Sequence, residues 1–313
     1  MKVCVLFNAA AGIHRAKQEA EIALVREAFV AAGVVANVES VEGSQLTAAA
    51  AVAARTDCDA VVGAGGDGTL NAVASALVDT LKPLGVLPCG TLNHFAQELG
   101  IPLDVPTAAR VIAAGHVRRI DVGDVNGHVF LNNSSIGMYP VAVQQRDEMR
   151  RVGLKKWPAM IVASLNVFHR FPLLAVRVET PNEELPRTTS FVFVGNNEYG
   201  TALFSLGKRA SLVAGVLSLY TADCTTRWHF LRLLARAAVG LRSKAFHFDR
   251  LVVPKLWVDT PEPQVLVSLD GEVVRLKSPL AYSSRPAALS VIAPADVATF
   301  RGRPLDLLLG VHP

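Results

Sequence analysis

The chain has 313 residues, enough for two domains that each bury a hydrophobic core. Hydrophobic residues make up 51% and charged residues 19%, a composition that excludes an intrinsically disordered protein. The formal net charge of +4 permits attraction to nucleotides or anionic lipid but requires neither.

Nothing in the sequence signals secretion or a membrane span. Every apolar run is interrupted before about eighteen residues, which is too short for a transmembrane helix. Met1 leads directly into a predicted strand, without the leader and cleavage pattern of a signal peptide. The cysteines lie far apart and form no Cys-x-x-Cys pair: Cys4, Cys58, Cys89 and Cys224. We therefore expect a cytoplasmic protein with reduced thiols.

Apolar strands and amphipathic helices alternate from the start of the chain to about residue 120. The predicted strands cover 3–7, 34–41, 59–64 and 84–87, and the predicted helices cover 16–32, 46–55 and 70–77. This alternation predicts a parallel sheet in a doubly wound α/β domain, residues 1–121. Right-handed crossovers would place the loops that follow the strands on one edge of that sheet.

The most informative loop is Gly65-Gly66-Asp67-Gly68-Thr69, directly after the apolar run 59–64. Glycines let the backbone approach a ligand and turn where a Cβ would clash. The carboxylate of Asp67 can face a phosphate through a divalent cation, and the helix that follows offers an N-terminus that favours anions. The motif predicts a phosphate site. Two plainer interpretations stay open, a tight strand-to-helix turn and a helix cap formed by Asp67.

Two other loops share this character. Residues 88–93 follow the strand 84–87 and supply a glycine, a hydroxyl and an amide, which suit phosphate and ribose. Residues 8–12 follow the first strand and end in a glycine. Folds of this kind bind ligands where the carboxyl ends of parallel strands meet, so we expect the three loops to converge.

The pattern changes after Ile120. Two short strands are predicted within 122–133, around the turn pair Asn126-Gly127, and one long helical region spans 140–169. Closely spaced strands follow at 173–178, 190–194, 216–220, 251–258, 265–269 and 288–292. They predict an antiparallel β-sandwich-like second domain, residues 122–293.

The order Asn-x-x-x-Gly, Gly-Gly-Asp-Gly-Thr-x-Asn and Pro-x-Gly-Thr-x-Asn-x-Phe-Ala resembles the diacylglycerol kinase catalytic-domain family of lipid kinases, which includes the sphingosine kinases. The first domain is similar to those of NAD kinase and phosphofructokinase. Short motifs continue the resemblance at 121–123, 195–197 and 269–272. The resemblance implies transfer of the γ-phosphate of ATP, with Mg²⁺, to the hydroxyl of a diacylglycerol-like lipid in phospholipid metabolism. It also suggests a homodimer, and a tail, 294–313, that packs on the first domain.

The same resemblance assigns roles to individual residues. Phosphoryl transfer needs charge neutralisation and alignment more than covalent chemistry. Asp67 would organise the Mg²⁺, directly or through water, and Glu272 would accept the proton of the lipid hydroxyl. The nucleotide would be held by Asn8, Gly12, Gly65, Gly66, Gly68, Thr69, Asn71, Gly90, Thr91 and Asn93.

Three further carboxylates are assigned less firmly. Asp121 and Asp124 are candidates for the network of water and metal, Asp124 as a metal ligand, and either could instead cap a turn. Asp270 would support Glu272. By itself, Asp270-Gly271-Glu272 is equally well interpreted as a hairpin turn.

Three positions depart from the family's pattern. Ala9 replaces a proline, which mildly changes the stiffness of the loop. His94 stands where relatives commonly have an aspartate, and its charge could change near neutral pH. Ala214 replaces an aspartate that helps some relatives to hold a structural Mg²⁺. Because alanine has no ligand atom, we expect no such structural ion, while the Mg²⁺ bound with ATP is still expected.

Two segments, 149–169 and 227–244, combine basic, aromatic and aliphatic residues in a helical pattern. Such helices can lie on an anionic membrane, or can pack on their own sheet with the arginines in solvent. We expect a peripheral protein at the inner membrane face whose partner is a membrane lipid. A nucleic-acid partner is not expected, because the basic residues form no binding motif. Two alternatives stay open, a kinase of a soluble alcohol similar to NAD kinase and a nucleotide-binding regulator without catalysis.

Overall fold

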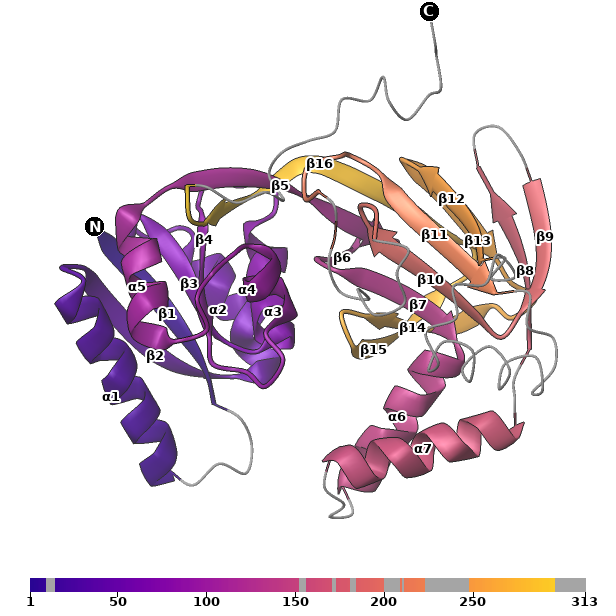
Figure 1. Ribbon diagram of the computed structural model, residues 1–313, viewed down its shortest axis with the longest axis horizontal. Coiled ribbons are helices and arrows are strands. Elements are labelled where there is room, and N and C mark those ends of the chain that lie inside the picture. The colour runs from indigo at the N-terminus through magenta and orange to yellow at the C-terminus, as the bar shows by residue number, and fades with distance from the viewer. Residues whose placement is uncertain are drawn as a thin grey trace, which may run out of the picture. The chain divides into compact units, whose positions relative to one another are not determined.

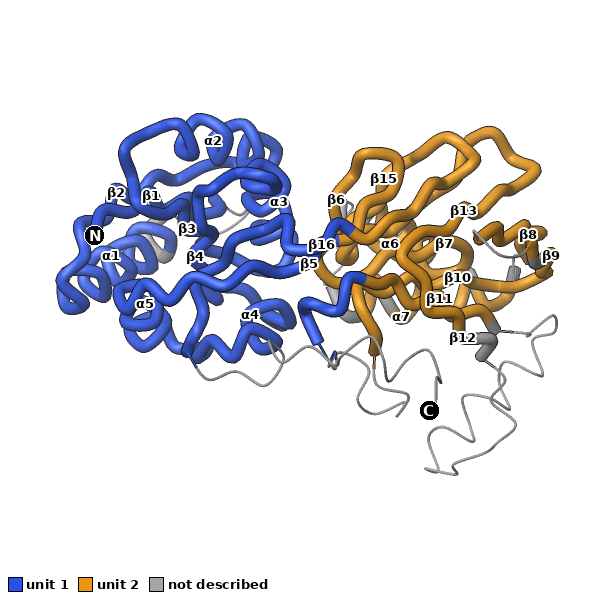
Figure 2. The backbone as a smooth tube through the Cα atoms, turned by 90° about the horizontal axis from the view of Figure 1, so that it is seen from above, with its two compact units in different colours: residues 1–122, 207–215, 285–313 blue, residues 123–206, 216–284 orange. Residues whose placement is uncertain are grey.

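The computed structural model describes residues 1–9, 15–151, 156–170, 173–180, 184–199, 209, 211–222 and 248–295. The chain divides into two compact units (Figure 2). Unit 1 contains residues 1–122, 207–215 and 285–313, and unit 2 contains residues 123–206 and 216–284. Two strands, β5 (Val117–Val125) and β16 (Leu280–Ile292), run from one unit into the other.

Unit 1 is a doubly wound α/β fold, as the sequence predicted. Its elements are β1 (Lys2–Ala9), α1 (Arg15–Ala31), β2 (Val35–Glu42), η1 (Gly43–Gln45), α2 (Leu46–Ala53), β3 (Ala60–Gly65), α3 (Asp67–Leu77), β4 (Leu84–Pro88), α4 (His94–Glu98) and α5 (Val105–Ala114). The strand order is β2-β1-β3-β4-β16, and all of these neighbours are parallel. Helix α1 packs with α5 and α2 packs with α3, and Figure 1 shows these pairs on opposite faces of the sheet.

The central strands of unit 1 lie in its core. Every residue of β3 and β4 is buried, as expected for strands that helices cover on both faces. Val291 of β16 pairs with Leu84 of β4 and so adds the end of the chain's last described strand to this sheet. For that reason residues 285–293 belong to unit 1, although the sequence had placed them in the second domain.

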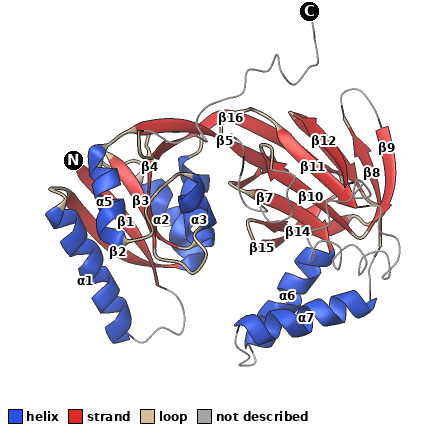
Figure 3. Cartoon of the chain, viewed as in Figure 1, coloured by secondary structure: helices blue, strands red, loops and turns tan. Residues whose placement is uncertain are grey.

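The described residues of unit 2 form an antiparallel β-sandwich with two added helices (Figure 3). Its elements are β6 (His128–Phe130), β7 (Asn133–Gly137), α6 (Met138–Arg151), α7 (Lys156–Arg170), β8 (Leu174–Glu179), β9 (Glu184–Thr189), β10 (Phe191–Asn196), β11 (Leu217–Ala222), β12 (Phe248–Val253), β13 (Lys255–Asp259), β14 (Gln264–Leu269) and β15 (Glu272–Lys277). One sheet has the order β12-β11-β10-β7-β14-β15, and the other contains the start of β16 with β13, β8 and β9. Their facing side chains form one core that includes Val192, Val194, Val267, Val176, Val178, Leu256 and Val258.

Several predicted boundaries were wrong. The long helix 140–169 is two helices, α6 and α7, and Gly153, a poor helix former, lies between them in the sequence. The strand 251–258 is two strands that meet at Pro254, which has no N–H to donate to a ladder. The polar strands β9 and β15 were not predicted.

Some predictions concern residues that are not described. They are Gly12, the segment 227–244, and residues 296–313 of the tail. None of the described helices is long and apolar enough to cross a membrane.

Candidate functional site

Two loops of unit 1, one between β3 and α3 and one between β4 and α4, touch through glycines. A Cβ on Gly90 would collide with the Cα of Gly66 and would lie 2.7 Å from the Oδ1 of Asn93. A Cβ on Gly65 would lie 2.6 Å from the Cβ of Thr69. The backbone N–H of Cys89 also donates to the carbonyl of Gly65 at 3.1 Å. Contact between the loops therefore requires glycine at position 90, and the turn into α3 requires glycine at position 65, in addition to anything a ligand requires.

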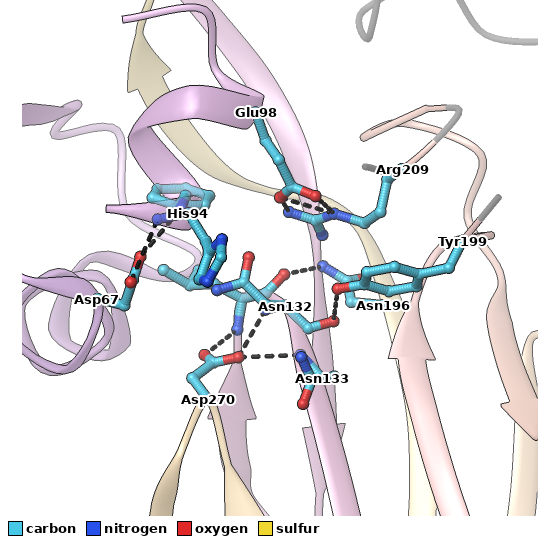
Figure 4. A network of polar contacts seen from close by, with 11 residues as sticks. Asp67, His94, Glu98, Asn132, Asn133, Asn196, Tyr199, Arg209 and Asp270 are labelled. Atoms are coloured by element: carbon cyan, nitrogen blue, oxygen red, sulfur yellow. Dashed lines mark hydrogen bonds and ion pairs between the residues drawn. The ribbon is translucent and has the colours of Figure 1, made fainter. Parts of the chain in front are cut away.

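Asp67 ties the same two loops together (Figure 4). It is the first residue of α3, whose cap residue is Gly66, and its carboxylate points at the other helix. Oδ1 accepts the backbone N–H of Phe95 at 3.0 Å, and Oδ2 accepts that of His94 at 3.2 Å. Asp67 therefore caps α4, not its own helix. Each oxygen keeps a second lone pair, which a cation could use.

Asn93 closes the loop that precedes α4. Its backbone is left-handed, with φ of 52°, a conformation that asparagine tolerates. Its Oδ1 accepts the N–H of Gly90 at 2.9 Å, and its Nδ2 donates to the carbonyl of Gly90 at 2.8 Å. The side chain is buried, whereas Thr91 and the neighbouring His94 are exposed. Asn93 thus shapes the loop, and Thr91 is accessible to solvent.

The first loop joins this group through Asn8. Its Nδ2 donates to the Oγ1 of Thr69 at 2.8 Å, and Thr69 is buried. The expected convergence of the three loops is thus present over their described residues. Asn71, also on α3, accepts the hydroxyl of Ser75 at 3.1 Å, while Gly68 is half-buried in the first turn of that helix.

The two other candidate metal carboxylates have structural partners. In unit 2, Asp124 accepts the N–H of Gly127 at 3.0 Å across the turn between β5 and β6. In unit 1, Asp121 is buried and accepts the N–H of Gly215 at 2.7 Å and that of Ala287 at 2.8 Å. Across the described part of the chain, no three His, Cys, Asp or Glu side chains are grouped to hold a metal. A Mg²⁺ at Asp67 would therefore take most of its ligands from phosphate and water, as Mg²⁺ bound with nucleotides usually does.

Asp270 and Gly271 form a two-residue hairpin turn in unit 2, and Glu272 directly follows it. Asp270 and Gly271 have positive φ, 49° and 91°, as a type I′ turn requires. The Asp270 carboxylate accepts three backbone N–H groups, those of residues 131, 132 and 133, at 2.7, 2.8 and 2.9 Å. Glu272 begins β15 and is exposed, and no described residue forms a hydrogen bond or ion pair with its carboxylate.

The motif Gly195-Asn196-Asn197 supports the segment that holds Asp270 (Figure 4). The Nδ2 of Asn196 donates to the carbonyl of Leu131 at 2.8 Å, and the hydroxyl of Tyr199 donates to that of Asn132 at 2.9 Å. These bonds fix the strand segment whose N–H groups converge on Asp270. The sequence alone identified the motif but did not indicate these hydrogen bonds.

A buried ion pair in unit 1 was missed entirely. Arg209 Nε donates to both carboxylate oxygens of Glu98 at 3.0 Å, and its terminal nitrogen bonds Oε2 as well. The side chains are only 1% and 4% exposed. Glu98 is the last residue of α4, so the pair anchors the helix that caps onto Asp67. No local pattern links residues 111 positions apart.

Comparisons with known proteins identify the family of the chain. The diacylglycerol kinase catalytic domain matches residues 2–125. A protein of Pseudomonas aeruginosa named "Probable lipid kinase YegS-like" is 30% identical over 249 residues, which cover 79% of this chain and 80% of that protein. The chain belongs to the diacylglycerol kinase catalytic-domain family.

The chain is also similar to other proteins. An uncharacterized protein of Synechocystis is 28% identical over 75% of this chain, and the match covers 55% of that protein, little more than half its length. A diacylglycerol kinase of Bacillus subtilis is 47% identical over 89 residues, 28% of this chain and 29% of that enzyme. Two crystal structures of a diacylglycerol kinase of Bacillus anthracis share the fold. One has a TM-score of 0.71 and 22% identity, and the other has a TM-score of 0.64 and 18% identity. Each comparison covers 94% of this chain and 97% of the other. Membership supports a kinase of the lipid-kinase type.

Proposed function

We propose that this protein transfers the γ-phosphate of ATP to the hydroxyl of a diacylglycerol-like lipid. The observation that carries the proposal is the meeting of three loops in unit 1, through the bond from Asn8 to Thr69, the approach of Gly66 to Gly90, and the capping of α4 by Asp67. Loops at the carboxyl edge of a parallel sheet, with glycines that admit close backbone approach, suit a polyphosphate. The lipid kinases of the family support a lipid as acceptor.

The residues present fit ATP with Mg²⁺. Gly66 and Gly68 offer backbone N–H groups and have no side chain in the way, and Thr69 and Asn8 are held beside them. Asp67 is oriented by two backbone N–H groups and would hold the metal, directly or through water. When bound, Mg²⁺ supplies neutralisation of the charge that develops on the transferred phosphoryl group.

The proton of the acceptor hydroxyl passes to Glu272 in this proposal. Its carboxylate is exposed and therefore accessible to an acceptor, whereas that of Asp270 is occupied by three backbone N–H groups. Asp270 then holds the turn that presents Glu272. We propose a peripheral location at the inner membrane face for the enzyme, because its acceptor is a bilayer lipid.

The test is the transfer of labelled γ-phosphate from Mg-ATP to diacylglycerol, phosphatidylglycerol and a sphingoid base in mixed micelles. Asp67→Asn is the inactive variant, and Asp104→Asn is its matched control, since Asp104 also caps a helix, by accepting the N–H of Thr107 at 2.9 Å. Labelled lipid from the wild type and the control, but not from Asp67→Asn, supports the proposal. Transfer only to soluble alcohols would show a soluble-substrate kinase instead. Stabilisation by ATP without any transfer would show a regulator, for which the exposed His94 in place of an aspartate is the supporting feature.

A further inference from the structure

The outer helix of unit 2 carries an exposed apolar stripe. Helix α7 packs on α6, which in turn packs on β7, β14 and β15 (Figure 1). Ala159 and Ala163, four residues apart, are completely buried and form the inner face of α7. Ile161 and Leu165, also four residues apart, are 59% and 62% exposed, and Val162 between them is 41% exposed.

This stripe contributes little to the packing of unit 2. Ala159 and Ala163 lie on the buried face of α7, so polar residues at 161, 162 and 165 would leave their packing unchanged. Single exposed aliphatic side chains are ordinary on protein surfaces, whereas several together on one helix face indicate an interaction site. The stripe therefore points to a partner that takes aliphatic side chains out of water.

Charge indicates which partner fits. Helix α7 contains no Asp or Glu and has Lys156 and Arg170 at its ends. Residues 138–170 include six Lys and Arg but two Asp and Glu, a net charge of +4 that equals the net charge of the whole chain. An apolar stripe within a basic segment matches the acyl and headgroup layers of an anionic bilayer. A second copy of the chain would instead bring like charges together.

We propose that the stripe formed by Ile161, Val162 and Leu165 docks unit 2 on an anionic lipid bilayer. The three aliphatic side chains enter the boundary between headgroups and acyl chains, and the net positive charge of this part of the sequence favours anionic headgroups. The inference rests on the proposed function, because a lipid kinase must meet a substrate that is held in the bilayer.

The binding test is co-sedimentation with vesicles of phosphatidylcholine, with and without phosphatidylglycerol. The variant is Ile161→Gln/Leu165→Gln, and the matched control is Leu24→Gln/Val30→Gln, which changes two exposed aliphatic residues of α1 in unit 1. Wild type and control should bind the anionic vesicles, and the variant should partition at least about tenfold more weakly because two aliphatic side chains no longer enter the acyl region. All three proteins should melt at the same temperature. Binding of the variant at the wild-type level would overturn the proposal, as would a wild type that binds no vesicles and dimerises through this stripe.

A second measurement separates the docking from the catalytic proposal. Phosphate transfer is compared between long-chain diacylglycerol in anionic vesicles and a short-chain diacylglycerol that is monomeric in water. If the stripe docks the enzyme, the variant loses activity on the vesicles and keeps activity on the soluble analogue. If the wild type binds vesicles but phosphorylates neither substrate, the kinase proposal fails and the docking stands. Equal loss on both substrates would contradict the docking role.

Discussion

The carboxylate of Asp67 accepts the backbone N–H of Phe95 at 3.0 Å, although the two residues lie in the first turns of different helices. A carboxylate at the N-terminus of a helix satisfies N–H groups that lack partners within the helix and offsets the positive end of its dipole. The residue that we assign to the metal therefore also joins two loops. Its two roles must be separated by experiment.

Asp67→Asn and Asp67→Ala should separate them. Alanine removes both acceptors and should lower the free energy of unfolding by about 1–2 kcal/mol, whereas asparagine keeps one acceptor oxygen and should lose less. Both should abolish phosphate transfer, because neither side chain carries the charge that a metal needs. Urea denaturation followed by circular dichroism and the transfer assay measure the two effects. An Asp67→Asn enzyme with wild-type turnover would leave Asp67 with the capping role alone.

The contact between the loops predicts that alanine at Gly66 and alanine at Gly90 change the stability by different amounts. A Cβ on Gly90 would collide with backbone, so Gly90→Ala should lower the free energy of unfolding by about 1–3 kcal/mol. A Cβ on Gly66 would find its nearest atom, the Cα of Gly90, at 3.4 Å, and the φ of Gly66 is −90°, so Gly66→Ala should change stability by less than about 0.5 kcal/mol. Thermal melts of the two variants test this contrast. Equal destabilisation would show that the loops do not touch in this way.

The sequence predicted what depends on local pattern. The buried strand before Gly65 and the helix after Asp67 follow from hydrophobic periodicity and from glycine chemistry, and both are present. The sandwich followed in the same way from closely spaced apolar strands. By contrast, Pro186 and several polar residues hid β9, and Pro286 made the long strand β16 look like a short one that begins at Ala288.

The sequence could not predict which partner each polar side chain has. Asp67 was interpreted as a ligand or as a cap for its own helix, and it caps another helix 27 residues away. Asp270 was interpreted as support for Glu272, and its partners are N–H groups 137 to 139 residues earlier. Such pairs are set by the tertiary fold, which brings distant backbone groups together, so no spacing in the sequence indicates them.

Asp270 and Glu272 should differ in stability and in activity. Asp270→Asn weakens the acceptor of three backbone N–H groups and should lower the stability of unit 2 by about 1–3 kcal/mol. Glu272 is exposed, so Glu272→Gln should change the free energy of unfolding by less than about 0.5 kcal/mol. This variant should still be stabilised by Mg-ATP against heat but should lose turnover. Trp257 lies on β13 of unit 2, so its fluorescence follows the unfolding of that unit. Normal turnover in Glu272→Gln would remove it as the base.

The ion pair between Glu98 and Arg209 provides the last prediction. Both side chains are almost completely buried, so removing one charge takes an oppositely charged partner from the other in the protein interior. Glu98→Met or Arg209→Met should therefore lower the free energy of unfolding by about 3–5 kcal/mol. Because Glu98 ends the helix whose first turn binds Asp67, the single variants should also bind ATP more weakly.

The double variant Glu98→Met/Arg209→Met tests whether a buried charge causes the loss of stability in the single variants. Two apolar side chains of similar length replace the pair without leaving a buried charge, so most of the lost stability should return. A double-mutant cycle, measured by denaturant unfolding at low and high salt, gives the coupling energy. That energy should hardly depend on salt, since a buried pair is weakly screened. A small coupling that disappears in salt would mean that the two side chains meet in water.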